Sequence, residues 1–374
     1  MPFGYFTTVV VLAVCTSCAL WPRVPEQTRP KSTTFWLGFM VNELPFLGAF
    51  VLAASTVLAA AQGDLLTRLG VVGAAIAAVT VVGLVVVARR ALPAREVMDR
   101  AVPGAAPGAR RPWARIVLWP VPFPSWSVRR HRNIAYAEGG RFHRLDVYRR
   151  RRGTPDGPTF VHFHGGAFRS GGKSREARPL LTRLAQQGWV CISANYRLTP
   201  HATFPDQLVD AKQVIAWVRG DGAGYGADGD VVIVSGSSAG GHIASMLALT
   251  INDPTLQPGF EAADTTVSAA VPLYGYLGPI DTRGLPSSPH DHVHEAAPPF
   301  LVVHGDHDSL VIARDAEAFV DHVRSVSSSA VAFAELPGAQ HDFDFFHSLR
   351  FEAVIDGIER FARSVVAAQR AAGS

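Results

Sequence analysis

Two stretches of the sequence contain residue types that could carry out nucleophilic chemistry. The first, HFHGGAFRSGGKS at residues 162–174, opens with His-Gly-Gly and ends with Gly-Gly-Lys-Ser. The second, VVIVSGSSAGGHIASMLAL at residues 231–249, holds Gly236, Ser238 and Gly240 in the order Gly-x-Ser-x-Gly, between a strand pattern and a helix pattern. A tight strand-to-helix turn of this kind exposes the central serine hydroxyl for attack on an acyl group. The second stretch therefore predicts Ser238 as a nucleophile.

The first stretch has a competing interpretation as a phosphate-binding loop. Such a loop has the spacing Gly-x-x-x-x-Gly-Lys-Ser/Thr, which would require a glycine in place of Ala167 if Gly172 and Lys173 were its later members. A β-carbon there hinders the close approach of the backbone to an anion. The spacing therefore favours the other interpretation, in which the His-Gly-Gly opening stabilises a developing oxyanion.

A serine is a weak nucleophile unless a base takes its proton and an acid orients that base. When a serine nucleophile lies on such a strand-to-helix turn, the acid and then the histidine follow it along the chain, each on a loop after a strand. Asp306 and Asp308 both follow the apolar run FLVVHG, and either could instead stabilise a turn. His341 follows the last strand pattern, in PGAQHDFD. The competing histidines fit less well: His304 closes a strand, His322 belongs to a predicted helix, and His347 lies near the start of the last predicted helix.

The residues from about 135 onward alternate between strand and helix patterns. Short apolar runs bounded by turn residues predict buried strands at 159–164, 189–196, 230–236, 267–275, 300–305 and 330–336. Helical spacing of apolar residues predicts helices at 175–187, 205–219, 238–250, 313–325 and 350–370. This alternation predicts an α/β fold, a mostly parallel sheet with helices on both faces.

Five motifs of this region follow one another in a fixed order: HGGAF at 164–168, ANYRLTPHATFPDQLVDAKQVIAWV at 194–218, GSSAGG at 236–241, HGDHDSLV at 304–311 and PGAQHDFD at 337–344. Together they resemble the hormone-sensitive-lipase-type carboxylesterases of the α/β-hydrolase fold. With the apolar runs that precede it, the whole chain resembles the membrane-anchored lipase/esterases of actinobacteria. The resemblance implies hydrolysis of acyl esters through an acyl-enzyme, with Ser238 as nucleophile, His341 as general base and Asp308 as the orienting acid.

The resemblance also implies an oxyanion hole built from backbone amides. The N–H groups of Gly165, Gly166 and Ala239 would bind the oxyanion, and His164 would brace the loop without taking part in the chemistry. Ala167 stands where many relatives have a third glycine, so bulky alcohol groups could be restricted.

The same triad also serves other reactions, because a fold does not fix the leaving group or the acceptor. An amide hydrolase, such as a peptidase or formamidase, and an acyltransferase stay open as alternatives. A catalytically silent, membrane-tethered binding module is disfavoured because every catalytic position is occupied. We expect a serine carboxylesterase or lipase whose substrate is a small-molecule or lipid acyl ester.

The segment SPHDHVHE places His290, His292 and His294 at alternate positions. Metal ligation by them is conceivable, but the neighbouring proline and serines indicate a loop, and a serine hydrolase needs no metal. We therefore expect neither a metal nor another cofactor. Three cysteines are too few for a disulfide framework.

The whole chain of 374 residues is unusually apolar, with 48% hydrophobic and 18% charged residues, and the excess of apolar residues lies in its first part. Apolar runs at 1–22, 46–61 and 69–88 predict about three transmembrane helices, since a span needs about 20 apolar residues. Extending the second run back to Phe35 takes in Asn42, Glu43 and Pro45, so this span could be tilted, broken or re-entrant. A cleaved signal peptide is the alternative for the first run, which lacks a basic leading region.

Basic residues gather on one side of these spans. Three follow the first run and four follow the third: Arg23, Arg29, Lys31, Arg89, Arg90, Arg95 and Arg100. Only Arg68 lies between the second and third runs, so the positive-inside rule places the catalytic domain in the cytoplasm. These arginines carry most of the excess behind the net charge of +4, and anionic lipid is a simpler partner for them than nucleic acid, so we expect no nucleic acid partner.

The predicted organisation is a transmembrane region at 1–90, a linker or strap rich in Arg, Pro and Trp at 91–134, and a catalytic domain at 135–374. Trp113, Trp119 and Trp126 suit either a membrane interface or a strap packed on the next domain. The connection from Tyr274 to Pro298 is too short for a large cap. We therefore expect the strap to cover the acyl pocket.

Overall fold

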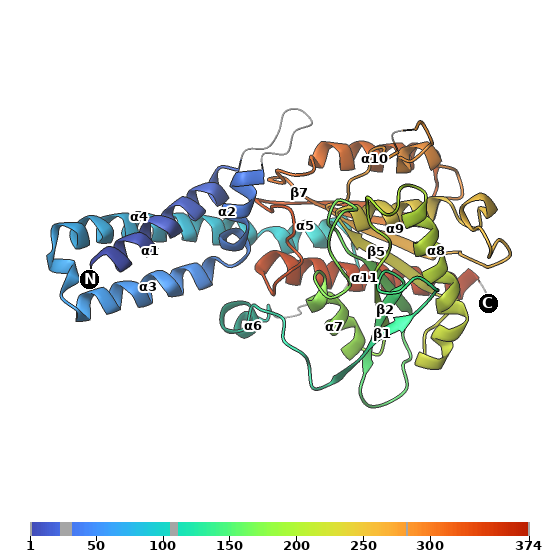
Figure 1. Cartoon of the computed structure of the whole chain (residues 1–374), viewed down its shortest axis with the longest axis horizontal. Coiled ribbons are helices and arrows are strands. Elements are labelled where there is room, and N and C mark those ends of the chain that lie inside the picture. The colour runs from blue at the N-terminus through green and yellow to red at the C-terminus, as the bar shows by residue number, and fades with distance from the viewer. Residues whose placement is uncertain (1, 23–31, 105–110, 282, 373–374) are drawn as a thin grey trace.

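The computed structural model describes residues 2–22, 32–104, 111–281 and 283–372. A helical bundle from the first part of the chain projects from an α/β domain, and the N-terminal end lies at the tip of the bundle (Figure 1). The bundle contains α1 (Pro2–Leu20), α2 (Ser32–Glu43), α3 (Pro45–Ala61) and α4 (Arg68–Ala91).

The α/β domain is built on one sheet of eight strands within the described residues. They are β1 (Val128–Ala135), β2 (Arg144–Arg150), β3 (Thr159–Phe163), β4 (Val190–Ala194), β5 (Val232–Ser237), β6 (Ala269–Leu273), β7 (Phe300–Gly305) and β8 (Val331–Leu336). Their order is β1-β2-β4-β3-β5-β6-β7-β8, and β2 pairs antiparallel with β1 and β4 while the other pairs are parallel. The mostly parallel α/β sheet is therefore confirmed, and all six predicted runs form strands.

The strands β1 and β2 are absent from the sequence-based prediction. Neither is an apolar run: β1 reads VRRHRNIA and lies at the edge of the sheet, where charged side chains face solvent. Asp146 of β2 is fully buried and binds Arg130 of β1 and, at 2.8 Å, Lys173. Because β1 begins at Val128, the last residues of the strap at 91–134 belong to the first strand of the sheet.

Helices cover both faces of the sheet, as predicted. One hydrophobic core lies under α8 (Asp206–Arg219), α9 (Ala239–Leu249) and α10 (Ala313–Val326). The opposite core lies under α7 (Arg178–Gln186), α11 (Leu349–Ala372) and α5 (Ala94–Ala101). Strand residues alternate between the two cores, so that Val234 faces the first and Ile233 faces the second.

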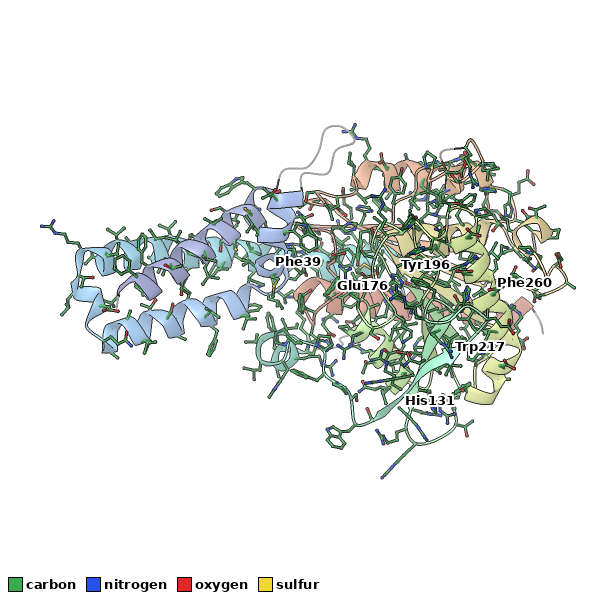
Figure 2. All side chains as sticks on the ribbon, viewed as in Figure 1. Phe39, His131, Glu176, Tyr196, Trp217 and Phe260 are labelled. Atoms are coloured by element: carbon green, nitrogen blue, oxygen red, sulfur yellow. The ribbon has the colours of Figure 1, made fainter. Side chains whose placement is uncertain are left out.

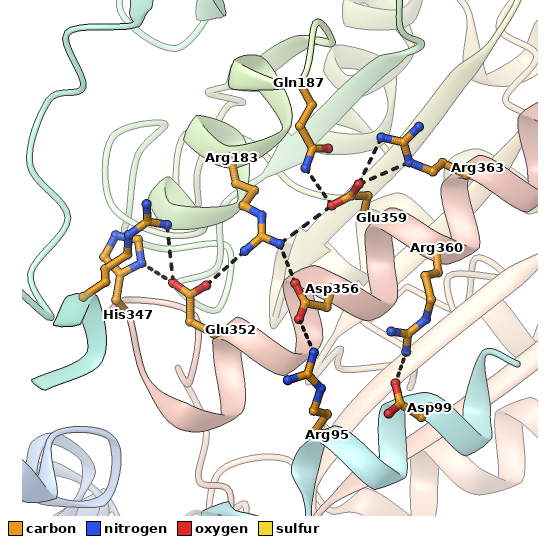
Figure 3. Close-up of polar contacts among 11 residues, drawn as sticks. Arg95, Asp99, Arg183, Gln187, His347, Glu352, Asp356, Glu359, Arg360 and Arg363 are labelled. Atoms are coloured by element: carbon orange, nitrogen blue, oxygen red, sulfur yellow. Dashed lines mark hydrogen bonds and ion pairs between the residues drawn. The ribbon is translucent and has the colours of Figure 1, made fainter. Parts of the chain in front are cut away.

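Helix α5, at the start of the predicted linker, connects α4 to the α/β domain. Ala94 and Met98 are fully buried, and a β-carbon on Gly357 of α11 would lie 2.1 Å from Met98 Cε. Ion pairs surround this contact (Figure 3): Arg95 with Asp356 at 3.5 Å, Asp99 with Arg360 at 2.6 Å, and Arg183 of α7 with Asp356 at 2.6 Å and with Glu352 at 3.3 Å. The start of the strap is thus a packed helix.

The second apolar run is broken between α2 and α3, which are bent by 86° relative to each other. The break is held by the α/β domain. Arg350, 1% exposed, donates from Nη1 to Asn42 O at 2.9 Å and to Glu43 Oε1 at 3.2 Å, and Asn42 Nδ2 donates to Gly338 O at 3.0 Å. Asn42 and Glu43 at this break are therefore hydrogen-bonded to residues of the α/β domain.

Two helical segments in the described residues, Phe3–Leu20 and Arg68–Ala101, are long and apolar enough to cross a membrane, and the bent pair adds a third if it counts as one span. Arg90 Nη1 donates to Leu20 O at 2.8 Å, so α1 and α4 end at the same end of the bundle, beside the α/β domain. The described ends of α1 and α4 therefore lie on the same side of the bundle as the α/β domain.

Arg350→Met is expected to lower the free energy of unfolding by about 3–5 kcal/mol, because Glu43 would keep a buried charge without its partner. Adding Glu43→Gln removes that charge and should restore part of the loss. The exposed pair Arg324–Asp321, 3.7 Å apart, provides the control, and Arg324→Met should cost less than about 1 kcal/mol. Thermal unfolding in detergent measures all three. Equal effects of Arg350→Met and Arg324→Met would contradict the assignment.

Candidate active site

Ser238 lies on the turn between β5 and α9, with φ of 54° and ψ of −115°. A positive φ is strained for a serine, and strain of this kind marks the strand-to-helix turn that exposes a nucleophile. The flanking glycines allow it: a β-carbon on Gly236 would lie 2.0 Å from Gly240 O, and one on Gly240 would lie 2.0 Å from Phe163 O. The Gly-x-Ser-x-Gly order is thus required by close backbone packing.

His341 Nδ1 lies 2.6 Å from Asp308 Oδ2, in the loop after β8. Asp308 is 1% exposed, and its Oδ1 accepts hydrogen bonds from the backbone N–H groups of Leu310 at 2.8 Å and Val311 at 2.9 Å. Asp306, the other candidate acid, instead accepts the N–H of Gly338 at 2.6 Å. The geometry therefore pairs His341 with Asp308.

The charges of this pair support one another. Burial by itself raises the pKa of Asp308, but the imidazoles of His341 and His304 lower that pKa below its ordinary value. Burial lowers the pKa of His341, and Asp308 outweighs it, so the pKa of His341 lies above its ordinary 6.5. A carboxylate on Nδ1 leaves Nε2 free to accept a proton and stabilises the imidazolium that results.

Ser238 and His341 line one cavity, with a volume of about 540 Å³. Among the described residues no hydrogen bond joins their side chains. In hydrolytic enzymes this bond is often long in the absence of substrate and tightens when substrate binds. The two side chains come from different loops of the sheet and meet at one site, as the sequence predicts.

Residues of the glycine loop after β3 also line this cavity. Gly166, Ala167 and Ala239 line it, and Gly166 and Ala167 have φ values of 114° and 52°. The N–H of Gly165, predicted as an oxyanion donor, instead donates to Glu176 Oε2 at 2.5 Å. A donor held by a buried carboxylate is not free to bind an oxyanion.

His164 lies behind this loop. Its ring stacks on Tyr196 with centroids 4.4 Å apart, and Tyr196 donates its hydroxyl hydrogen to His164 O at 2.7 Å. Burial lowers the pKa of His164 to about 4, so the ring is neutral near pH 7. Figure 2 marks Tyr196 and Glu176 in the α/β domain. This geometry suits the predicted bracing role of His164.

A network of buried acids that the sequence did not predict lies beside the site. Asp344 accepts hydrogen bonds from Ser237 Oγ at 2.6 Å and from Tyr274 Oη at 2.5 Å, and the Tyr274 ring lies 4.5 Å from the His341 ring. Burial raises the pKa of Asp344 to about 6, and burial and Asp344 together raise that of Glu176 well above its ordinary value. Asp344 belongs to the PGAQHDFD motif, so its position three residues after His341 was the one sequence feature that could have indicated it.

Helix α2, and not the tryptophan strap, closes the cavity. Phe35 and Trp36 of α2 line it, and Phe35 meets the His341 ring edge to face at 6.2 Å. The expectation for the strap was wrong: Trp113 packs on Phe46 of α3, and the other two strap tryptophans are 60% and 92% exposed. None of the three strap tryptophans lines the cavity that holds Ser238 and His341.

The alternate histidines of SPHDHVHE do not converge. His290 stacks on His322, with their Nδ1 atoms 3.4 Å apart, and His292 Nε2 lies 2.9 Å from Pro286 O. Within the described ranges, no group of three or more His, Cys, Asp or Glu side chains is placed to hold a metal ion.

Known proteins resemble this chain in sequence. A family profile described as BD-FAE matches residues 145–285. The probable carboxylic ester hydrolase LipM of Mycobacterium tuberculosis is 41% identical over 64% of this chain and 62% of its own length. For the esterase LipQ of the same organism the identity is 39%, over 61% of each chain. The chain thus spans about three fifths of the length of these two relatives.

Solved structures share the fold. Esterase 2 of Thermogutta terrifontis, phosphorylated by paraoxon, superposes with a TM-score of 0.56 and 24% identity, covering 64% of this chain and 94% of that one. A truncated carbohydrate esterase from gut microbiota gives a TM-score of 0.54 and 21% identity, covering 62% and 96%.

One further relative establishes the family. The esterase LipC of Mycobacterium tuberculosis is 34% identical over 67% of this chain and 71% of its own length. The BD-FAE match at residues 145–285 includes Ser238 and the glycine loop. The chain therefore belongs to the α/β-hydrolase family of esterases that includes LipM, LipQ and LipC.

Proposed function

We propose that this protein is a membrane-anchored serine carboxylesterase or lipase that works through an acyl-enzyme. The observation that carries the proposal is the His341–Asp308 pair, 2.6 Å apart, in a cavity shared with the strained Ser238. Relatives named as esterases or as a carboxylic ester hydrolase support it. The apolar cavity lining suits an acyl chain better than a peptide or a free amide.

In the proposed reaction Ser238 Oγ attacks the ester carbonyl carbon while His341 Nε2 takes the hydroxyl proton. The carbonyl oxygen becomes an oxyanion, His341 returns the proton to the leaving alcohol, and an acyl-enzyme results. Water then attacks in the same way, so the acid is released and Ser238 regains its proton. Each step uses only protein groups, the ester and water.

The proposed oxyanion hole differs in one member from the sequence-based set. Gly166 and Ala239 are kept, because both line the cavity beside Ser238. Ala167 replaces Gly165, whose N–H is bonded to Glu176. Losing one such donor costs about 3 kcal/mol of transition-state stabilisation in comparable enzymes.

We further propose that the bundle spans the membrane with the catalytic domain in the cytoplasm. The helices are long and apolar enough, and the basic residues flank the ends of α1 and α4 that lie beside that domain.

Ser238→Ala is expected to lower ester turnover by about 10⁶-fold, since the nucleophile is lost. Its melting temperature should barely change. Ser245→Ala, which removes a buried hydroxyl from the same helix, is the matched control and should keep its activity. The assay compares a short-chain nitrophenyl ester with the corresponding anilide and with transfer to an alcohol. Normal ester turnover by Ser238→Ala would exclude the mechanism, and preferred anilide cleavage or transfer would favour an amidase or acyltransferase.

The pH dependence follows from His341, which accepts a proton only when neutral. Because Asp308 raises the pKa of His341, kcat/KM should fall as the pH drops through a value above 6.5. In Asp308→Asn the charge that raises this pKa is gone, so the apparent pKa should shift downward and kcat should drop by about 10⁴-fold. An unchanged apparent pKa in Asp308→Asn would assign the titration to another group.

Sidedness is tested by reporters fused to the C-terminus of the full chain. A cytoplasmic domain should give a fluorescent green fluorescent protein fusion and an inactive alkaline phosphatase fusion. Fusions after Leu66, in the turn between α3 and α4, should give the opposite pattern. Active phosphatase at the C-terminus would reverse the proposed orientation.

A further inference from the structure

Helix α2 presents three distinct faces. Gly38 packs on α1 so closely that a β-carbon there would lie 2.9 Å from Ala19 N. Phe35 and Phe39 face the α/β domain, where Phe35 is fully buried and Phe39 packs on the aromatic rings of Phe345 and Phe346. Figure 2 shows Phe39 at the junction of the bundle and the α/β domain. The third face carries three exposed apolar side chains, Trp36, Leu37 and Met40, which are 60%, 41% and 48% exposed.

The orientation of α2 follows from the bend at its end. Because α2 and α3 are bent by 86° relative to each other, α2 lies along the membrane surface if α3 runs across the membrane. The bend is fixed by Arg350, which binds Asn42 and Glu43. A tryptophan on such a helix suits the interface between headgroups and acyl chains.

Trp36 belongs both to this exposed face and to the catalytic cavity. Across the cavity the lining is also largely apolar, with Ile280, Leu310 and Val311 among its residues. Helix α2 therefore forms one wall of the cavity, and its Trp36, Leu37 and Met40 side chains are exposed on the outside of that wall. Exposed apolar side chains that gather on one helix face mark a contact with a partner or a membrane, and the neighbouring apolar helices α1, α3 and α4 favour a membrane here.

We propose that α2 is an interfacial helix that forms the membrane-side wall of the catalytic cavity, and that the substrate is a long-chain ester resident in the bilayer. Its acyl chain passes Trp36 to reach Ser238 without crossing water. This inference rests on the proposed esterase function. It assigns a substrate class and an entry side to that site.

The test uses the full chain in phosphatidylcholine vesicles with two substrates, a soluble short-chain nitrophenyl ester and dioleoylglycerol in the bilayer. The variant Leu37→Gln with Met40→Gln changes the exposed face without touching the cavity lining. Its activity on dioleoylglycerol should fall about tenfold, which corresponds to about 1.4 kcal/mol, while soluble ester turnover stays unchanged. Trp36→Gln should lower turnover of both substrates.

Trp126→Gln is the matched control, because Trp126 is 92% exposed on the strap and is not part of the cavity. It should leave both activities unchanged. Wild-type activity of the Leu37 and Met40 variant on dioleoylglycerol would overturn the proposed entry side. Failure of the unmodified enzyme on dioleoylglycerol, with normal soluble ester turnover, would overturn the substrate class alone. Failure on both substrates would instead refute the esterase function.

Discussion

The buried hydrogen bond between His341 and Asp308 is the constraint on which the site depends. Asp308 is held by the amides of Leu310 and Val311 and by His304, whose Nε2 lies 3.2 Å away, so the carboxylate cannot turn without losing several partners. The loops that carry Ser238, Asp308 and His341 follow β5, β7 and β8, which belong to the parallel part of one sheet. Parallel strands bring their carboxyl ends to the same edge, so the topology itself assembles the site.

The acids beside the site connect its separate parts. Asp344 joins Ser237, next to the nucleophile, to Tyr274, which packs on His341, and Glu176 holds the amide of Gly165. Burial and the neighbouring acids raise the pKa of Glu176 well above its ordinary value, and burial raises that of Asp344 to about 6, so the charged forms of both groups are disfavoured relative to free carboxyls. The network thus fixes the glycine loop, the serine turn and the histidine relative to one another.

Local patterns account for what the sequence could predict. Buried parallel strands are short apolar runs, and the Gly-x-Ser-x-Gly turn is a local constraint, so the sheet is confirmed and the roles of Ser238 and His341 stay specific predictions. Strands β1 and β2 have charged sequences whose pairing depends on tertiary partners such as Asp146. The contact of Phe35 with His341 joins opposite ends of the chain, so no local pattern could indicate that α2 closes the cavity. The competing engagement of Gly165 by Glu176 likewise depends on folding.

The docking of α5 on α11 has a consequence for where this protein can work. Met98 is buried against Gly357, and ion pairs from Arg95 and Asp99 brace the same contact, so α4 and α5 join the bundle firmly to the α/β domain. A catalytic domain held in this way cannot move away from the bundle on a flexible linker. Under the proposed membrane anchoring, lateral diffusion would govern its encounters, and the relevant abundance of its substrate would be molecules per unit of membrane area.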